Sequence, residues 1–354
     1  MKRILVTGGA GFVGSCLAIG VRTHRPDTQV VALDNLKRRG SELNLERLKE
    51  GGVSFVHGDI RRPEDLEAAG SVDLVIECSA EPSVLAGYGE SPQYLVHTNL
   101  TGTVNCLEVA RRYGAGVIFL STSRVYPMET IRGLRYREIG TRFELAAHQE
   151  VPGVSSEGFS EAFPLDGVRS LYGATKLCSE LLLNEYREMY GLPAVINRCG
   201  VLTGPWQMGK VDQGVVVLWV ARHLYGGALS YIGYGGHGKQ VRDMLHVDDL
   251  LELVLYQFDH LEALSGQTFN VGGGRAVSAS LQELTGLCRE ITGNTLEIGR
   301  EAAERPADIP LYLSDHGRVT RATGWQPKRD VRRILEDVYR WLRENQEALR
   351  PILG

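Results

Sequence analysis

The sequence lacks the features that mark most metal-binding, secreted and membrane-spanning proteins. Its six cysteines lie far apart, with no CxxC pair and no cysteine–histidine cluster, and its nine histidines are equally scattered. Zinc sites and disulfide frameworks need closely spaced ligands, so we predict no metal and buried free thiols. The chain begins with a predicted strand, "MKRILVTGG", and contains no signal or transit peptide and no long apolar run. We therefore expect a cytoplasmic protein with no membrane partner.

A large excess of charge of either sign is also missing. The 39 basic and 43 acidic residues leave a net charge of -4, so nothing indicates binding to nucleic acid or to a membrane surface. We interpret the basic runs at 37–39 and 329–333 as solvated faces. A length of 354 residues suits one large or two medium domains with a substantial core.

Short β-branched runs alternate with longer helical segments through the first half of the chain. The six predicted strands are 3–8, 29–35, 53–59, 72–79, 116–123 and 194–200. Predicted helices include 12–22, 94–113 and 170–186. Near-continuous apolar strands that alternate with helices predict an α/β fold, with a doubly wound parallel sheet of the Rossmann type covered on both faces.

The polar segment 128–168 interrupts this alternation and is too long for an ordinary connection, so we predict a structured insertion with a short hairpin at 138–146. The pattern loosens after residue 200. We predict a first domain over 1–200, which includes the insertion, and a smaller mixed α/β lobe over 201–354. A final helix from Asp330 carries an apolar stripe that we expect to be buried. The stripe consists of Ile334, Leu335, Val338, Trp341 and Leu342.

The stretch "VTGGAGFVGSCLA" follows the first strand and opens a helix, fitting G-x-G-x-x-G as Gly9, Gly11 and Gly14. Glycines allow a tight turn and close approach of the backbone, and the helix N-terminus attracts a pyrophosphate. Asp34 ends the second strand 20 residues after Gly14, where a carboxylate can hold a ribose diol and repel a 2′-phosphate. This favours NAD, while the basic run 37–39 keeps NADP open. A methyltransferase-like nucleotide fold is an alternative.

In the helix 170–186, apolar residues recur at helical spacing and predict one buried stripe. The stripe consists of Leu171, Ala174, Cys178, Leu181 and Leu182. Tyr172 and Lys176 are four residues apart, so we expect them side by side on a face turned away from the core. An ammonium group and a nearby cationic nicotinamide both lower the pKa of a tyrosine, ordinarily about 10, and so let it act as a base. Without a cofactor nearby, a solvated pair is the alternative.

Three motifs together resemble the extended short-chain dehydrogenase/reductase family, specifically its nucleotide-sugar epimerases and dehydratases. They are "VTGGAGFVG" (6–14), "LSTSRVYP" (120–127) and "YGATK" (172–176). Further similar pieces are "HTNLTGTVN" (97–105), "QVRDMLHVDDL" (240–250) and "ERPADIPLYLSD" (304–315). The resemblance covers nearly the whole chain. It implies a tightly bound and recycled NAD, a nucleoside-diphosphate sugar as substrate, and a homodimer formed through the helices 94–113 and 170–186.

The resemblance also implies roles for individual residues. The catalytic residues would be Thr122, Tyr172 and Lys176. The cofactor would be held by Gly8, Gly11, Phe12, Val13 and Gly14 at the pyrophosphate, Asp34 and Asn35 at the adenosine ribose, Asp59 and Ile60 at the adenine, and Ala80, Asn99, Tyr172, Lys176 and Cys199 elsewhere. The substrate would contact Thr122, Ser123, Arg242 and Arg305, the two arginines gripping the diphosphate with their forked donors.

One departure from the family pattern and one further similarity narrow the expected reaction. The 4,6-dehydratases carry an acid pair directly after the threonine, whereas Ser123 and Arg124 stand there in this chain, so the resemblance favours an epimerase. The segment 197–216 is similar to that of 2-epimerases acting on CDP-sugars, and we therefore expect oxidation at carbon 2. A UDP-sugar 4-epimerase, an NAD(P)-dependent keto-sugar reductase and a non-catalytic NAD-sensing protein are the alternatives.

Overall fold

A computed structural model describes residues 2–209 and 213–354 of the chain. The chain folds into two compact units, each assembled from three segments. The first unit consists of Met1–Val125, Leu171–Arg198 and Leu250–Phe269. The second consists of Tyr126–Ser170, Cys199–Asp249 and Asn270–Gly354.

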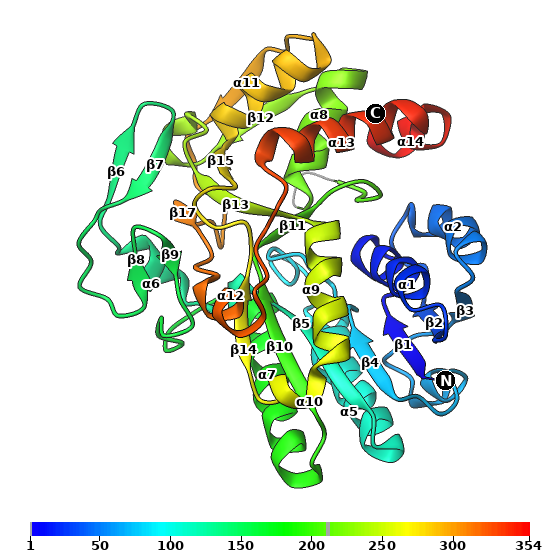
Figure 1. Ribbon diagram of the computed structural model, residues 1–354. Coiled ribbons are helices and arrows are strands. Elements are labelled where there is room, and N and C mark those ends of the chain that lie inside the picture. Colours follow the sequence, from blue (N-terminus) through cyan, green and yellow to red (C-terminus); the bar gives the residue numbers. More distant parts are fainter. Residues whose placement is uncertain (1, 210–212) are drawn as a thin grey trace. The chain divides into compact units, whose positions relative to one another are not determined.

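The first unit is built on a seven-stranded sheet in the order β14-β10-β5-β4-β1-β2-β3 (Figure 1). Its strands are β1 (Arg3–Thr7), β2 (Gln29–Asp34), β3 (Ser54–His57), β4 (Leu74–Glu77), β5 (Gly116–Thr122), β10 (Ala194–Cys199) and β14 (Thr268–Val271). β1 pairs in parallel with β2 and β4, β2 with β3, and β4 with β5. The predicted parallel sheet and its six predicted strands are confirmed. The strand order reverses between β1 and β4, and ligands of such sheets bind at the carboxyl ends of the strands beside that point.

Helices cover both faces of this sheet. They are α1 (Phe12–His24), α2 (Asn44–Glu50), α3 (Pro63–Glu67), α4 (Gln93–Val96), α5 (Gly102–Tyr113), α7 (Leu171–Tyr190), α9 (Val247–Asp259) and α10 (Leu261–Leu264), with the short turns η1 (Ser41–Leu43), η2 (His97–Thr101) and η3 (Ser123–Val125). Leu5, Val75 and Phe119 share one buried core with residues of α5 and α7. Because alternate residues of a strand face opposite sides, the buried Ile4 and Val6 face the other layer, and α1 packs on β1 and β2.

Helix α7 is rotated relative to the prediction. Leu171, Cys178 and Leu181 were expected to be buried, yet all three are exposed, and Leu181 is 60% exposed. Lys176, expected on the solvent side, is only 2% exposed. The buried residues of the helix are Gly173, Thr175, Lys176, Ser179, Glu180 and Leu183. The apolar stripe therefore does not mark the inward face of this helix.

The inward face of α7 is polar because each polar side chain has a partner in the core. The Ser179 hydroxyl donates to the backbone carbonyl of Asn99 at 3.0 Å. The Glu180 carboxylate accepts hydrogen bonds from the Arg198 guanidinium at 2.7 Å and from the Ser121 hydroxyl at 2.5 Å. Hydrogen-bonded polar groups are tolerated in a core where unpaired ones are not. These contacts fasten α7 to β5 and β10.

The second unit contains several small sheets. A four-stranded sheet is formed by β11 (Val201–Thr203), β13 (Val241–His246), β15 (Ser278–Ser280) and β17 (Leu311–Tyr312). Two-stranded pairs are β6 (Tyr136–Ile139) with β7 (Arg142–Leu145), β8 (Val154–Ser155) with β9 (Gly158–Phe159), and β12 (Leu229–Ile232) with β16 (Ile298–Glu301). The antiparallel β6–β7 pair confirms the predicted hairpin.

The helices of the second unit confirm one predicted core stripe. They are α6 (Met128–Arg132), α8 (Val215–Tyr225), α11 (Leu281–Thr292), α12 (Gly317–Thr323), α13 (Val331–Glu344) and α14 (Gln346–Leu353), with the turn η4 (Tyr234–Gly236). All five residues expected in the stripe of the last long helix are buried on α13. The six cysteines are free, but only Cys106, Cys199 and Cys288 are buried. Among the described helices, none combines the length and the apolar character needed to cross a bilayer.

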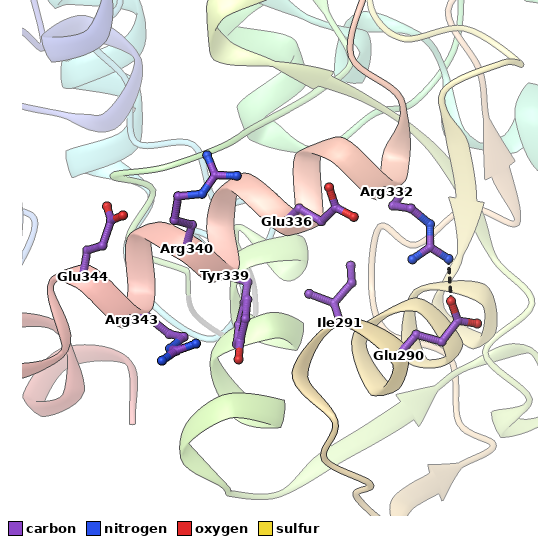
Figure 2. Close-up of a pocket in the computed structure, with 8 residues that line it drawn as sticks. All are labelled: Glu290, Ile291, Arg332, Glu336, Tyr339, Arg340, Arg343 and Glu344. Carbon is purple, nitrogen blue, oxygen red and sulfur yellow. Dashed lines mark hydrogen bonds and ion pairs between the residues drawn. The ribbon is translucent and has the colours of Figure 1, made fainter.

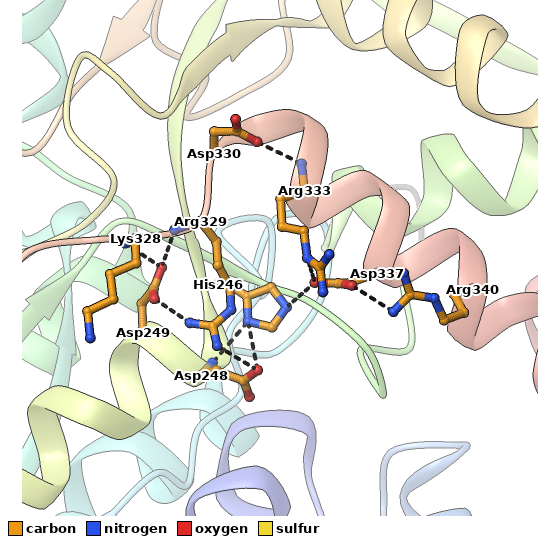
Figure 3. A network of polar contacts seen from close by, with 9 residues as sticks. All are labelled: His246, Asp248, Asp249, Lys328, Arg329, Asp330, Arg333, Asp337 and Arg340. Atoms are coloured by element: carbon orange, nitrogen blue, oxygen red, sulfur yellow. Dashed lines mark hydrogen bonds and ion pairs between the residues drawn. The ribbon is translucent and has the colours of Figure 1, made fainter.

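A network of charged groups joins the end of β13 to the start of α13 (Figure 3). The Asp249 carboxylate accepts the backbone N–H groups of Lys328 and Arg329 at 3.2 and 3.1 Å and pairs with the Arg329 guanidinium. The buried His246 ring lies 3.8 Å from the Asp337 carboxylate, and burial lowers the pKa of this histidine. We interpret this network as structural, since it fixes the strand that carries Arg242.

The buried Glu180–Arg198 pair makes a testable prediction about stability. Glu180→Gln should lower the free energy of unfolding by ~3–5 kcal/mol, because the buried arginine loses its counter-charge. Urea denaturation followed by circular dichroism measures the change. The matched control is Glu290→Gln, which breaks the exposed Arg332–Glu290 pair and should cost about 1 kcal/mol or less. Equal effects of the two substitutions would contradict the interpretation.

Candidate cofactor and catalytic site

The glycine turn after β1 is sterically closed to larger residues. A Cβ on Gly14 would lie 2.1 Å from the carbonyl oxygen of Gly8, and a Cβ on Gly9 would lie 2.6 Å from the Cβ of Ala32. Gly8 itself has φ +64°, a conformation that glycine adopts without strain. The Gly11 N–H donates to the Gly8 carbonyl at 2.9 Å and closes the turn.

This turn fits a dinucleotide pyrophosphate. Helix α1 begins immediately after Gly11, and no side chain caps its N-terminus. Phe12 and Val13, predicted to hold the cofactor, form its first turn and are partly buried. The first N–H groups of a helix have no partner inside the helix and carry a partial positive charge, so they bind phosphate oxygens. The chain thus provides the donors that this part of NAD requires.

Asp34 lies at the end of β2, beside the glycine turn. One carboxylate oxygen accepts the N–H of Ala10 at 3.1 Å, and the other accepts the N–H of Leu36 at 2.8 Å. Burial raises the pKa of Asp34, opposed by these backbone hydrogen bonds. The carboxylate is therefore held rigidly at the edge of the turn. The sequence predicts that it binds the ribose of the cofactor there.

The other predicted adenosine residues form one cluster at the ends of β2 and β3. The Asn35 amide donates to the Asp59 carboxylate at 2.9 Å, and the Arg61 guanidinium donates to the same carboxylate at 2.9 and 2.6 Å. Burial opposes ionisation of Asp59, but these hydrogen bonds outweigh it and hold its pKa below the usual range. Ile60 is buried, and its carbonyl accepts the Asn105 amide at 2.8 Å.

Two cations of this cluster share one aromatic ring. The Lys37 ammonium lies 2.8 Å from the centroid of the Tyr94 ring, and the Arg61 guanidinium lies 4.7 Å from it. Cations are attracted to the face of an aromatic ring. Lys37, which left NADP open in the sequence, is therefore engaged with Tyr94.

The loop after β4 is anchored by Asn99, one of the predicted cofactor residues. The fully buried Asn99 side chain accepts the N–H of Glu81 at 2.8 Å and donates to the Glu81 carbonyl at 3.1 Å and to the Thr175 hydroxyl at 3.4 Å. Ala80, directly before Glu81, is partly buried. Asn99 thus connects this loop to the first turn of α7.

The predicted catalytic residues gather where β5 meets α7. Thr122 ends β5 and is buried, with its hydroxyl accepting the N–H of Arg124 at 3.2 Å. Ser123 begins the turn η3, and both β5 and η3 pack on α7. Tyr172, in the first turn of α7, is partly buried, and Lys176 follows one turn later. All these residues belong to the first unit.

Lys176 makes a buried ion pair that the sequence did not predict. Its ammonium lies 3.3 Å from the Glu77 carboxylate at the end of β4, and 4.5 Å from the centroid of the Phe119 ring. Burial opposes the charged ammonium, but attraction to Glu77 and to Tyr172 outweighs it and raises the pKa of Lys176. Burial raises the pKa of Glu77, opposed by Lys176. A charged residue in the apolar run "VDLVIECS" was the signal that could have revealed Glu77.

The two predicted diphosphate arginines lie in the second unit. The Arg242 guanidinium, on β13, donates to the Asp308 carboxylate at 2.9 Å and to the Ile309 carbonyl at 2.8 Å. The Arg305 carbonyl accepts the Asp308 N–H at 3.3 Å, which closes a turn containing Ala307 at φ +61°. Asp308 therefore connects Arg242 to the turn of Arg305, a link that sequence spacing did not suggest.

Other predicted positions are less informative. Cys199 ends β10 and is buried. The segment 197–216, on which the resemblance to 2-epimerases rested, includes residues 210–212, which lie outside the described residues. Among the described residues, no group of histidine, cysteine, aspartate or glutamate side chains could hold a metal ion.

A surface cavity of about 640 Å³ lies between α11 and α13 of the second unit (Figure 2). Its lining is mostly charged and contains none of the predicted site residues. The lining residues are Glu290, Ile291, Arg332, Glu336, Tyr339, Arg340, Arg343 and Glu344. The charged groups belong to an exposed helix face and point to no particular ligand.

Comparison with known proteins identifies the family of the chain. Residues 4–272 match the model of the NAD dependent epimerase/dehydratase family. The chain belongs to this family. A curated member, the CDP-paratose 2-epimerase of Salmonella typhi, is 29% identical over 346 residues, which is 96% of this chain and 98% of the relative.

Solved structures of the family include both reaction types. A UDP-glucose 4-epimerase of Thermus thermophilus in complex with NAD is 27% identical with a TM-score of 0.76, over 96% of this chain and 99% of that one. A double mutant of a dTDP-glucose 4,6-dehydratase of Streptomyces venezuelae with NAD bound is 29% identical with a TM-score of 0.80, over 99% of each chain. The shared fold holds NAD in both, and it does not select between epimerisation and dehydration.

Asp243, the neighbour of Arg242, predicts a pH dependence of stability. Burial raises its pKa to about 6, although the Ser314 side chain and the Gly274 N–H hydrogen-bond to it. An acid whose pKa is raised on folding contributes stability below its ordinary pKa of 3.8, and this contribution is lost as the pH rises to about 6.

Asp243→Asn should therefore reduce the loss of stability between pH 4 and pH 8. The expected reduction is about 2.5 kcal/mol, since one pKa unit corresponds to about 1.4 kcal/mol and part of the contribution is already lost at pH 4. Urea denaturation at the two pH values measures it, and the exposed Asp259→Asn serves as a control. An unchanged pH dependence in Asp243→Asn would show that this carboxyl ionises normally.

Proposed function

We propose that this protein is a redox-neutral epimerase of a nucleoside-diphosphate sugar that keeps its NAD bound throughout the reaction. The proposal is supported by the packing of β5, which ends at Thr122, on α7, which carries Tyr172 and the buried Lys176, in the unit that also contains the glycine turn. We further propose a CDP-sugar as substrate and carbon 2 as the reacting centre. The similarity to CDP-paratose 2-epimerase and the sequence of segment 197–216 support this assignment.

The chemistry assigns a distinct task to each catalytic residue. Bound NAD supplies a hydride acceptor that can return the hydride to the opposite face of the sugar. Tyr172, as phenolate, removes the proton from the sugar hydroxyl and later gives it back. The Lys176 ammonium favours the phenolate by charge attraction. The Thr122 hydroxyl would hydrogen-bond to the same sugar oxygen and orient it for proton transfer to Tyr172.

The remaining predicted residues would bind the two nucleotides. The turn of Gly8, Gly11 and Gly14 would hold the NAD pyrophosphate, with Asp34 at the ribose. Arg242 and Arg305 would bind the substrate diphosphate, to which forked guanidinium donors are suited. The proposed reaction requires tight retention of NAD. If the reduced cofactor left the site, the sugar would remain oxidised as a keto-sugar.

The other reactions of the family are less well supported. A 4,6-dehydratase needs an acid and a base to eliminate water, and the residues after Thr122 are Ser123 and Arg124. A UDP-sugar 4-epimerase uses the same residues, so only the substrate distinguishes it. A keto-sugar reductase would need a fresh reduced cofactor in every turnover.

The purified protein should convert its sugar nucleotide with no added cofactor and retain NAD through dialysis. A panel of CDP-, UDP-, GDP- and dTDP-sugars, followed by proton NMR in deuterated water, identifies the substrate and the inverted carbon. Hydride return predicts no deuterium at that carbon. A requirement for stoichiometric NADPH would contradict the epimerase, and loss of the 6-hydroxyl would indicate a dehydratase.

Tyr172→Phe should lower the turnover rate by roughly 10²–10⁴-fold, since it removes the general base and leaves the ring. The rate is measured by the same NMR assay at saturating substrate. Tyr190→Phe is the matched control, because Tyr190 lies on the same helix and is exposed, and it should retain full activity. Wild-type turnover by Tyr172→Phe would refute the mechanism.

We also propose that the chain forms a homodimer through α7 and α5. Leu171, Cys178 and Met189 are exposed and lie within about 20° of one another around α7. Leu181 is exposed beside them, and Tyr113 is exposed at the end of α5. An exposed apolar helix face of this kind is typical of a protein–protein interface.

Leu181→Glu should convert the dimer to a monomer of 39.0 kDa, because it places a charge in an apolar interface. Size-exclusion chromatography with light scattering measures the mass. Ile139→Glu, at the exposed tip of the β6–β7 hairpin, should leave the dimer intact. A wild-type protein that is monomeric at micromolar concentration would exclude the dimer.

A further inference from the structure

The ion pair between Glu77 and Lys176 is buried more deeply than a surface salt bridge. The Glu77 side chain is 1% exposed and the Lys176 side chain 2% exposed, with 3.3 Å between the carboxylate and the ammonium. Glu77 ends β4, where Val75 of the same strand faces the core beneath α5 and α7. The carboxylate therefore reaches Lys176 from beneath α7, through the layer between the sheet and the helix.

The pair lies in the core, out of contact with water, so the two charges depend on each other. The Phe119 ring lies on one side of the ammonium, and Cys106 of α5 lies near the carboxylate. The backbone N–H of Ser79 also favours the ionised Glu77 carboxylate. A charge buried in such surroundings is costly unless an opposite charge accompanies it.

We propose that Glu77 is a positioning residue for the reaction proposed above, and that its carboxylate keeps the Lys176 ammonium charged and fixed beside the Tyr172 phenol. This inference rests on the proposed function, in which Lys176 favours the phenolate of Tyr172. Glu77 itself touches neither substrate nor cofactor in this scheme. It acts only through Lys176.

The physical argument concerns what Lys176 would do without its partner. A lysine in an apolar interior loses its proton readily, because burial disfavours the charged form. A neutral amine would not stabilise a phenolate. The ammonium interacts with Glu77, Cys78 and Tyr172 and with the Cys106 thiol. Burial and Glu77 raise the pKa of that thiol, and Lys176 opposes this. The Glu77 carboxylate thus offsets the effect of burial on the pKa of Lys176.

The first test is the titration of Lys176 in the whole protein without substrate. The chain has seven lysines, so Cε-labelled lysine gives few NMR signals, and Lys176→Met identifies the one that matters. In Glu77→Gln, an isosteric change, the Lys176 midpoint should fall by at least about one pH unit, a tenfold change in its acid dissociation constant. An unchanged midpoint would overturn the proposal.

Two variants separate positioning from a general loss of stability. Glu180→Gln removes a different buried carboxylate, which lies on α7. It should leave the Lys176 midpoint unchanged, because Glu180 pairs with Arg198. Glu77→Asp keeps the charge and should restore most of the shift. If Glu180→Gln moved the midpoint as far as Glu77→Gln does, the effect would be one of packing, and the proposal would be wrong.

The second test follows epimerisation against pH. In Glu77→Gln the alkaline limit of activity should move to lower pH, because Lys176 loses its proton earlier. Its acid limit should stay unchanged, because Lys176 is still charged at that pH and Glu77 acts only through Lys176. A lower rate with both limits unchanged would contradict the proposal. A shifted Lys176 midpoint in a protein that epimerises none of the sugars would refute the proposed function and leave the charge-holding role of Glu77 standing.

Discussion

The rotation of α7 about its own axis depends on the pairing of buried charges. Lys176 and Glu180 both face the sheet, and each meets an opposite charge there, Glu77 and Arg198 respectively. Unpaired, either group would be excluded from the core. Because these two pairs fix the inward face, they also determine where Tyr172 lies at the start of the helix. The candidate site is therefore positioned by electrostatic partners on β4 and β10 as much as by apolar packing.

The same pairing explains which parts of the fold could be predicted from the sequence. The parallel strands were predictable because their β-branched runs are buried on both faces, whatever their neighbours are. The glycine turn was predictable because its geometry is local and leaves no space for a Cβ on Gly14. The inward face of α7 was not predictable from periodicity. Its apolar stripe, with Leu181 at 60% exposure, points outward, and the polar face is buried through partners that lie up to 99 residues away.

Some residues of the candidate site could also be found from the sequence, and others could not. Tyr172 and Lys176 could be found from their spacing, and Asp34 from its distance to the glycine turn. Glu77 was missed because a single acid in an apolar strand has no periodic signal, and Asp308 because its contact with Arg242 spans 66 residues. Such residues are far apart in the chain and meet only in the folded protein, so a single sequence does not reveal their pairing.

Relatives that share this fold epimerise or dehydrate sugars with the same cofactor, so the outcome is decided by a few side chains near the reacting carbon. Ser123 and Arg124 after Thr122 provide no carboxyl for water elimination, which is why we propose epimerisation. In the proposed mechanism, Glu77 contacts Lys176 and acts on the base Tyr172 only through it. A carboxylate that contacts Lys176 would support proton transfer from the sugar hydroxyl to Tyr172. Because it does not lie beside Thr122, it would offer no acid to a leaving group.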